Sequence, residues 1–152
     1  MLNALNKLWS QTLLPMLSRP RRLQVAALCY RQTDTGREVL LITSRDTGRW
    51  VLPKGWPMAG KTSAESAVQE AWEEAGVAKS RFDETPLGCY SYDKRLDNGA
   101  VEPLETLVYA VEVQELQECF PEAHERSRSW MSPAEAATRV DEPELRDLLN
   151  NF

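Results

Sequence analysis

Three glutamates, Glu70, Glu73 and Glu74, stand close together in a segment with helical spacing. An α-helix turns by about 100° per residue, so Glu73 and Glu74 lie about 60° and about 40° to either side of Glu70 around the axis. Like charges at these spacings repel, and the carboxyl end of a helix disfavours negative charge. Mg²⁺ or Mn²⁺ would compensate them, because hard cations prefer oxygen ligands. The alternative is a solvated acidic face of a surface helix.

The helix that carries these glutamates is predicted over residues 63–75. Thr62 and Glu65 have the spacing of a capping box, and Gly76 stands where a left-handed residue ends a helix. One face carries small apolar residues at helical period, which permit close packing on a sheet. This stripe consists of Ala64, Ala67, Val68, Ala71 and Ala75. The glutamates are therefore predicted beside a buried helix face.

The segment from Gly55 to Val77 resembles the Nudix box, G-x5-E-x7-R-E-U-x-E-E-x-G-U, in which U is an aliphatic residue. The positions in register are Gly55, Glu70, Glu73, Glu74, Gly76 and Val77, with Ala71 at the inner aliphatic position. The resemblance continues upstream through QVAALCYR, EVLLITSR and RWVLPKG, and downstream through ETLVYAVEV and SWMSPAEA. The chain is therefore similar to Nudix hydrolases, and within them to the diphosphoinositol polyphosphate phosphohydrolase-like branch.

This resemblance implies an α/β protein with a Nudix-type α/β/α sandwich and a central mixed sheet, which cleaves pyrophosphate linkages with Mg²⁺ or Mn²⁺. The expected substrate is a small polyphosphorylated molecule: a nucleoside diphosphate derivative, a dinucleoside polyphosphate or a diphosphoinositol polyphosphate. By register, the metal ligands would be Glu70, Glu73, Glu74 and the backbone carbonyl of Lys54. Glu70 and Glu73 are the expected catalytic bases. Weaker base candidates outside the box are Glu102, Glu105, Glu122 and Glu125.

Two positions depart from the family pattern. Lys61 stands where the box has its first glutamate, and Gln69 stands where it has arginine. Our hypothesis is that these two positions normally interact, so that their joint replacement leaves neither charge unpaired. Because all three metal-binding glutamates are present, we expect hydrolytic activity. The alternative is a degenerate Nudix domain that binds a phosphorylated ligand without turnover.

Basic and aromatic residues near the box are the expected substrate-binding groups. Arg45, Arg49, Lys54 and Lys61 lie on segments beside the predicted helix and would receive phosphates. Arg126 and Arg128 are further candidates for closing the site from the other side. Trp56, Tyr90 and Tyr92 are candidates for stacking on a base, with core packing as the alternative for the tyrosines.

A second motif overlaps the same residues. The stretch from Gly55 to Thr62 matches G-x4-G-K-T, the phosphate-binding P-loop. A P-loop surrounds phosphate with consecutive backbone N–H groups, and Pro57 has none. Trp56 and Met58 are bulky where close backbone approach is needed. A P-loop nucleotide-binding protein is therefore the third interpretation, behind the two Nudix ones.

The remaining chain predicts one mixed α/β domain over residues 21–152. Strands are predicted over residues 23–30, 38–44, 49–52, 87–94 and 104–113. Turn residues Thr33–Gly36 make a hairpin of the first two strands, and Asp97-Asn98-Gly99 separate the last two. Helices are predicted from Pro133, with Ser132 as the N-cap, and over residues 142–150.

Residues 1–20 are expected to form a separate N-terminal appendage. Apolar side chains at three- and four-residue spacing over residues 2–16 predict an amphipathic helix. It would pack on its own domain or on a second copy of the chain, which leaves a homodimer open. The same pattern also fits a helix that lies on a membrane surface, or an organellar presequence.

Composition excludes several classes of protein. The net charge of −5 over 152 residues argues against nonspecific nucleic-acid binding, which requires a basic surface. The apolar runs are far shorter than the ~20 residues of a membrane span. Three cysteines, an odd number, do not make a disulfide framework, and one histidine excludes a histidine-rich zinc site. We therefore expect a cytoplasmic protein that binds neither nucleic acid nor a membrane core.

Overall fold

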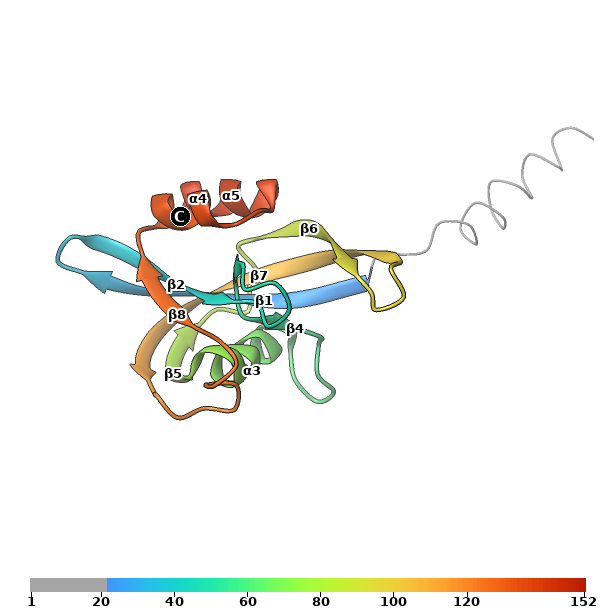
Figure 1. The fold of residues 1–152 in the computed structure, drawn as a ribbon. Coiled ribbons are helices and arrows are strands. Elements are labelled where there is room, and N and C mark those ends of the chain that lie inside the picture. Colours follow the sequence, from blue (N-terminus) through green and yellow to red (C-terminus); the bar gives the residue numbers. More distant parts are fainter. Residues whose placement is uncertain (1–21) are drawn as a thin grey trace, which may run out of the picture.

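A computed structural model describes residues 22–152, whose centre is one eight-stranded mixed sheet (Figure 1). The predicted appendage over residues 1–20, with its amphipathic helix, lies outside the described residues. The long strands β1 (Arg22–Thr33) and β7 (Val101–Leu116) are parallel neighbours. The other elements are β2 (Gly36–Thr43), β3 (Trp50–Val51), β4 (Lys54–Gly55), α3 (Ser63–Ala75), β5 (Val77–Phe82), β6 (Gly88–Arg95), β8 (Arg128–Met131), α4 (Pro133–Arg139) and α5 (Pro143–Asn150).

The sheet is mixed because only the β1–β7 pair is parallel among the described strands. Five strands follow the order β3-β2-β1-β7-β5. The short strand β4 pairs antiparallel with β1, and β8 pairs antiparallel with β2. β7 is long enough to pair with two strands in succession, β6 along its first half and β5 along its second. This arrangement places β4 beside the first half of β1, opposite Val25 and Ala26.

Successive side chains of β1 belong to two separate hydrophobic cores, one on each face of the sheet. Val25, Ala27 and Cys29 belong to the core beneath α3, whereas Ala26 and Leu28 belong to the core beneath α4 and α5. Successive side chains of a strand point to opposite faces, so a strand covered on both sides is apolar throughout. Figure 1 shows α3 on one side of the sheet and α4 with α5 on the other. The predicted α/β/α sandwich with a mixed sheet is confirmed.

Helix α3 begins and ends where the sequence predicted. The Thr62 hydroxyl accepts from the Glu65 backbone amide, and the Glu65 carboxylate accepts from the Thr62 amide, which completes a capping box. Gly76 ends the helix with a φ of 76°, in the left-handed region. The alanine stripe is fully buried against the sheet. The glutamates therefore lie on a helix whose position is held at both ends and along one face.

Three strands were not predicted: β4, β5 and β8. β4 has two residues next to Pro53, whose carbonyl accepts from the Ala27 amide. β5 and β8 each carry charged side chains, and neither has an apolar run of its own. They are strands because β5 pairs with β7 and β8 pairs with β2. The predicted strands and C-terminal helices otherwise appear with boundaries that differ by a few residues.

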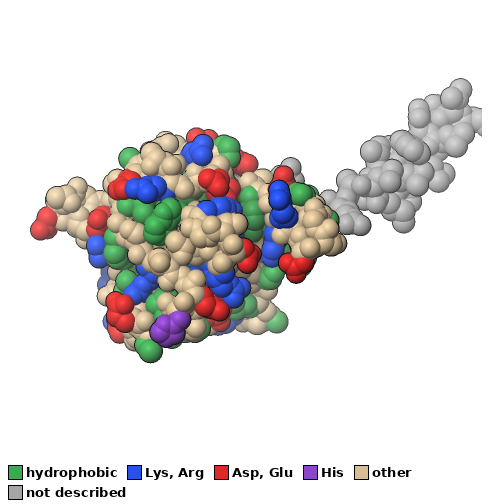
Figure 2. Space-filling view, viewed as in Figure 1, with side chains coloured by type: hydrophobic (Ala, Val, Ile, Leu, Met, Phe, Trp, Pro, Cys, Tyr) green, Lys and Arg blue, Asp and Glu red, His purple; other side chains and the backbone are tan. Residues whose placement is uncertain are grey.

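The surface shown in Figure 2 has basic and acidic side chains intermingled. His124 is exposed, and all three cysteines are free thiols. Within residues 22–152, no helix combines the length and the apolar character that crossing a membrane requires.

Candidate functional site

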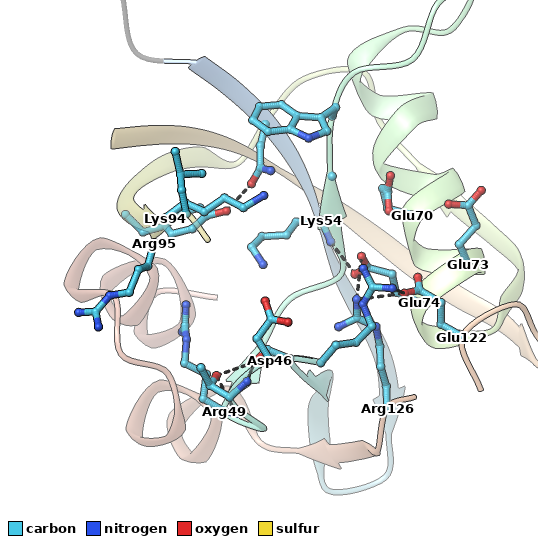
Figure 3. Close-up of a pocket in the computed structure, with 18 of the residues that line it drawn as sticks. Asp46, Arg49, Lys54, Glu70, Glu73, Glu74, Lys94, Arg95, Glu122 and Arg126 are labelled. Carbon is cyan, nitrogen blue, oxygen red and sulfur yellow. Dashed lines mark hydrogen bonds and ion pairs between the residues drawn. The ribbon is translucent and has the colours of Figure 1, made fainter. Parts of the chain in front are cut away.

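A cavity of about 910 Å³ opens beside α3 and β4, and all three box glutamates line it (Figure 3). α3 and the segment from Pro121 to Arg126 provide one side. The loop before β3 and the turn between β6 and β7 provide the rest. Its charged lining residues are Arg45, Asp46, Arg49, Lys54, Glu70, Glu73, Glu74, Asp93, Lys94, Arg95, Asp97, Glu122 and Arg126. The strongly charged lining indicates a ligand that is itself highly charged.

Glu70 lies against the backbone of Gly55 and is almost fully buried. A Cβ atom at position 55 would stand 2.2 Å from Glu70 Oε1 and 2.4 Å from its carboxyl carbon. The glycine is therefore required because the carboxylate occupies the space of a side chain. Among the described residues, no hydrogen bond or ion pair reaches the Glu70 carboxylate. Burial, and then the neighbouring charges of Glu74 and Glu73, raise the pKa of Glu70 to about 8.

Glu74 is also buried, but its carboxylate has partners. Oε2 accepts a hydrogen bond from the Lys54 backbone amide at 3.1 Å. Oε1 lies 3.2 Å from Nη2 of Arg126, whose side chain is 7% exposed. Burial raises the pKa of Glu74, while Arg126 and the Lys54 amide oppose that increase. The backbone of β4 and a buried arginine thus fix the direction of this carboxylate.

Glu73 is positioned by the residue that departs from the family pattern. Gln69 Nε2 donates to Glu73 Oε1 at 3.0 Å, one helical turn away. The backbone carbonyl of Glu73 accepts from the Glu122 amide at 3.0 Å, which brings the Glu122 segment alongside α3. Lys61, the other departure, is exposed and does not line the cavity. Its charge is solvated, so it leaves no buried unpaired group.

The donor set of this acidic wall fits a hard divalent cation, although the ligands are not gathered into a finished site. Among residues 22–152, no three carboxylate, imidazole or thiol side chains stand close enough to form a ready-made metal centre. Carboxylate oxygens are the ligands that Mg²⁺ and Mn²⁺ prefer. Burial and mutual repulsion leave the Glu70 charge poorly compensated, as its raised pKa indicates. A cation among these glutamates would supply the missing positive charge.

Basic side chains of the described residues also line the cavity, and three of the six, Arg45, Arg49 and Arg126, form ion pairs. Arg45 lies 3.2 Å from Glu122, and Arg49 lies 2.7 Å from the buried Glu142. Burial lowers the pKa of Lys54, with smaller opposing contributions from nearby charges. Of the four predicted phosphate-binding residues, the structure brings Arg45, Arg49 and Lys54 to the cavity and leaves Lys61 outside it.

The remaining sequence candidates divide between cavity and core. Trp56 and Tyr92 line the cavity, whereas Tyr90 is buried in the core beneath α4 and α5. Arg126 and Glu122 line the cavity. Arg128 instead donates to the carbonyls of Ala75 and Gln117. The candidates that the cavity lining does not include are Arg128, Glu102, Glu105 and Glu125.

Sequence reasoning missed the end of β6, and the turn that follows it, as part of the site. Lys94 and Arg95 lie on the side of the cavity away from the α3 glutamates (Figure 3). The Lys94 ammonium stands 5.6 Å from the centre of the Trp56 ring, and the Arg22 guanidinium stands 4.1 Å from it. Two adjacent basic residues just before a predicted Asp97-Asn98-Gly99 turn were the available signal.

The loop from Gly55 to Thr62 does not form a phosphate-binding P-loop. Three of its backbone amides are already engaged: Met58 donates to the Ser66 hydroxyl, Lys61 to the Met58 carbonyl and Thr62 to Glu65. Pro57 has no amide hydrogen to contribute. β4 also pairs antiparallel with β1. The hydrogen bonds of Met58 and Thr62 to Ser66 and Glu65 hold the loop against the start of α3. The P-loop interpretation is wrong.

Comparison with known proteins gives one family and one fold. The model of the NUDIX domain matches residues 22–152. Nudix hydrolase 13, mitochondrial, of Arabidopsis thaliana is 35% identical over 106 residues, which cover 65% of this chain and 51% of the relative. Human diphosphoinositol polyphosphate phosphohydrolase 3-beta is 29% identical over 115 residues, which cover 74% of this chain and 65% of the relative. The chain thus spans between half and two thirds of the length of these curated relatives.

Among solved structures, a crystal structure of the C. elegans Ap4A hydrolase is similar in fold, with a TM-score of 0.67. The two chains are 20% identical, and the match covers 88% of this chain and 96% of the other. The likeness establishes the shared architecture of sheet and helices.

Proposed function

This chain belongs to the NUDIX domain family, and from that premise we propose that it is a pyrophosphohydrolase that depends on a divalent cation. The observation that carries the proposal is the composition of one cavity. Glu70, Glu73 and Glu74 line it from a single edge of α3. Lys94 and Arg95 lie across from them (Figure 3). An acidic wall for a cation and a basic wall for phosphates suit a metal-bound polyphosphate.

The proposed reaction is attack of water on phosphorus. The water oxygen forms a new P–O bond, the bridging P–O bond breaks, and the bridging oxygen leaves with the departing phosphate. Mg²⁺ or Mn²⁺, when bound, would neutralise the phosphates and lower the pKa of the attacking water. Glu70, Glu73 and Glu74 would hold the cation, and the Lys54 carbonyl is a further proposed ligand. The Lys54 backbone is next to the site, since its amide contacts Glu74.

The proton of the attacking water requires a carboxylate base. Glu70 and Glu73 are the proposed bases, and both line the cavity. The raised pKa of Glu70 belongs to the metal-free site, and a bound cation would lower it and so keep the carboxylate ionised, as a base requires. Gln69 orients Glu73 by its hydrogen bond. Arg45, Arg49 and Lys54 are the proposed phosphate-binding groups, to which the cavity adds Lys94 and Arg95.

Three substrate classes fit this description: nucleoside diphosphate derivatives, dinucleoside polyphosphates and diphosphoinositol polyphosphates. The name of the human relative supports the third class. The name of the C. elegans hydrolase, whose likeness is in fold, points to the second. These two names favour the highly phosphorylated classes over the first. Trp56 and Tyr92 offer aromatic surface for a base if the substrate is a nucleotide.

The test is hydrolysis of a panel with one member of each class: ADP-ribose, diadenosine tetraphosphate and a diphosphoinositol pentakisphosphate. We expect Mg²⁺- or Mn²⁺-dependent turnover of at least one, and the preferred substrate identifies the class. The variant carrying Glu73→Gln and Glu74→Gln should lose that turnover. Glu84→Gln, an exposed glutamate outside the cavity, is the matched control and should keep it.

A degenerate domain that binds without turnover is the second candidate, favoured by Lys61 and Gln69 in place of the family glutamate and arginine. The hydrogen bond from Gln69 to Glu73 weighs against it, because this departure supports a proposed ligand. Folded protein that binds Mn²⁺ and a panel member but hydrolyses none would favour the degenerate domain. Turnover that appears only in Lys61→Glu with Gln69→Arg would show that the departures abolished activity.

A cytoplasmic location and a homodimer stay predictions from the sequence, as does the absence of nucleic-acid binding. Relatives named mitochondrial and chloroplastic make location the first of these to test. Fractionation of cells that express the tagged full chain would decide it.

A further inference from the structure

Arg126 is a cation buried among the proposed metal ligands. Its side chain is 7% exposed, and its Nη2 atom lies 3.2 Å from Glu74 Oε1 and 3.3 Å from Glu122 Oε1. Its Nη1 atom donates to the Thr43 carbonyl at 3.0 Å. Figure 3 shows this guanidinium between the Glu74 and Glu122 carboxylates, on the glutamate side of the cavity. The arginine therefore faces the acidic groups, and the phosphate-binding side lies elsewhere.

The hydrogen bonds of Arg126 are incomplete, so its ion pairs must offset the cost of burying it. Among the described residues, its buried Nε atom has no hydrogen-bond partner. A buried donor without an acceptor costs free energy, so a neutral side chain would be easier to accommodate. Ion pairs with Glu74 and Glu122 offset that cost. Without Arg126, the buried Glu74 carboxylate would lose its ion-pair partner, whereas Glu122 would keep its pair with Arg45.

Both carboxylate oxygens of Glu74 already have a partner, and a divalent cation would compete with Arg126 for this group. The Lys54 amide already occupies Oε2, and Arg126 occupies Oε1. A divalent cation bound by Glu74 would stand beside the guanidinium, and two positive charges at such a distance repel strongly away from bulk water. The Thr43 carbonyl and Glu122 would still hold the arginine if its contact with Glu74 were broken.

We infer that Arg126 is the counter-ion of Glu74 in the metal-free protein, and that a divalent cation displaces it from this carboxylate. The inference rests on the proposed function, since it takes Glu74 as a metal ligand. Arg126 then acts as a positioning residue with two effects. It keeps the buried glutamates compensated before the cation arrives, and it weakens cation affinity by competing for Glu74.

The first test is Mn²⁺ affinity, measured from the electron paramagnetic resonance signal of free Mn²⁺ with no substrate present. Arg126→Gln should bind Mn²⁺ at least threefold more tightly than the unaltered protein, because the competitor is gone. Arg126→Lys keeps the charge and should bind within twofold of it. Arg139→Gln is the matched control, since Arg139 pairs with the exposed Glu135 and lies outside the cavity lining, and it should also stay within twofold.

A second test uses the unaltered protein, in case Arg126→Gln does not fold without metal. The Nε–H resonance of Arg126, assigned by its loss in Arg126→Lys, should shift on titration with Mg²⁺ and saturate at the binding constant. An unchanged resonance at saturating Mg²⁺ would overturn the inference. So would weaker or equal Mn²⁺ binding by Arg126→Gln, which would instead make the arginine an aid to metal binding. If the unaltered protein bound no Mn²⁺ at all, the proposed function would fail as well.

Discussion

Gly55 and Glu70 are linked by a steric requirement: the glutamate carboxylate occupies the position that a side chain at residue 55 would need. The two residues lie on different elements, β4 and α3, joined by a seven-residue loop. Close approach is achieved because β4 pairs with β1 while the alanine face of α3 packs on the same sheet. The box glycine is therefore a condition for the direction of the Glu70 carboxylate.

Gly55→Ala should reduce kcat by at least 100-fold, because its Cβ would displace the carboxylate that acts as ligand or base. Steady-state kinetics on the best panel substrate would measure this. The control is Gly60→Ala, whose backbone φ of 78° makes alanine cost about 1–2 kcal/mol while its surroundings are open. If both variants lose stability but only Gly55→Ala loses turnover, the steric account holds. Equal turnover in the two variants would contradict it.

The free energy of unfolding of the metal-free protein should fall as pH rises, because of Glu70. The pKa of this carboxyl is raised from its ordinary value of 4.5 to about 8 in the folded protein. Between these values the folded state holds a proton that the unfolded chain releases, so the free energy of unfolding decreases with rising pH. Urea unfolding in EDTA from pH 5 to pH 9 would measure the slope. Glu70→Gln should flatten it and Glu84→Gln should not; identical slopes would refute the assignment.

Lys94 and Arg95, at the end of β6, should govern substrate affinity. Replacing Lys94 and Arg95 with alanine should raise KM about tenfold and leave kcat within threefold, because neither side chain lies near the glutamates that act on water. The ratio between variant and unaltered protein should shrink at high salt, since ions screen exposed charges. The control is alanine at Lys79 and Arg81, which are exposed on β5 and outside the cavity. A loss confined to kcat would argue against phosphate binding by Lys94 and Arg95.

The ion pair between Arg49 and Glu142 should stabilise the fold as well as the site. Glu142 is buried at the start of α5, and its Oε1 lies 2.7 Å from Arg49 Nη1. Glu142→Gln should lower the free energy of unfolding by about 2 kcal/mol, between the values for exposed and fully buried pairs. Glu135→Gln breaks an exposed pair with Arg139 and should change it by under about 0.5 kcal/mol. Equal effects in chemical denaturation would show that burial is unimportant here.

Local chemistry made the acidic half of the site predictable. The bounds of α3 follow from its capping box and from Gly76, and the positions of its glutamates follow from helix geometry. The buried strands β1 and β2 were predictable from their apolar runs, which two cores require. These features depend on residues close together in the sequence.

The basic half of the site depends on residues far apart in the sequence. Arg126 meets Glu74 across more than fifty positions, and only the full fold brings them together. Lys94 and Arg95 reach the cavity because β6 pairs with β7, a register that no local pattern predicts. Lys61 shows the reverse: it is adjacent to the helix in sequence, yet it is exposed and does not line the cavity. Position in the sequence thus located Arg45, Arg49 and Lys54 at the cavity, but it missed Lys94 and Arg95 and wrongly added Lys61.

The proposed function requires that the α3 glutamates hold the cation needed for hydrolysis, and the dependence of turnover on Mg²⁺ tests this requirement. Turnover of the best panel substrate is measured against Mg²⁺ concentration for the unaltered protein and for Glu74→Gln. We predict no turnover in EDTA, saturation with Mg²⁺ in the unaltered protein, and at least 100-fold slower turnover by Glu74→Gln at saturating Mg²⁺. Turnover in EDTA, or full activity in folded Glu74→Gln, would contradict the account.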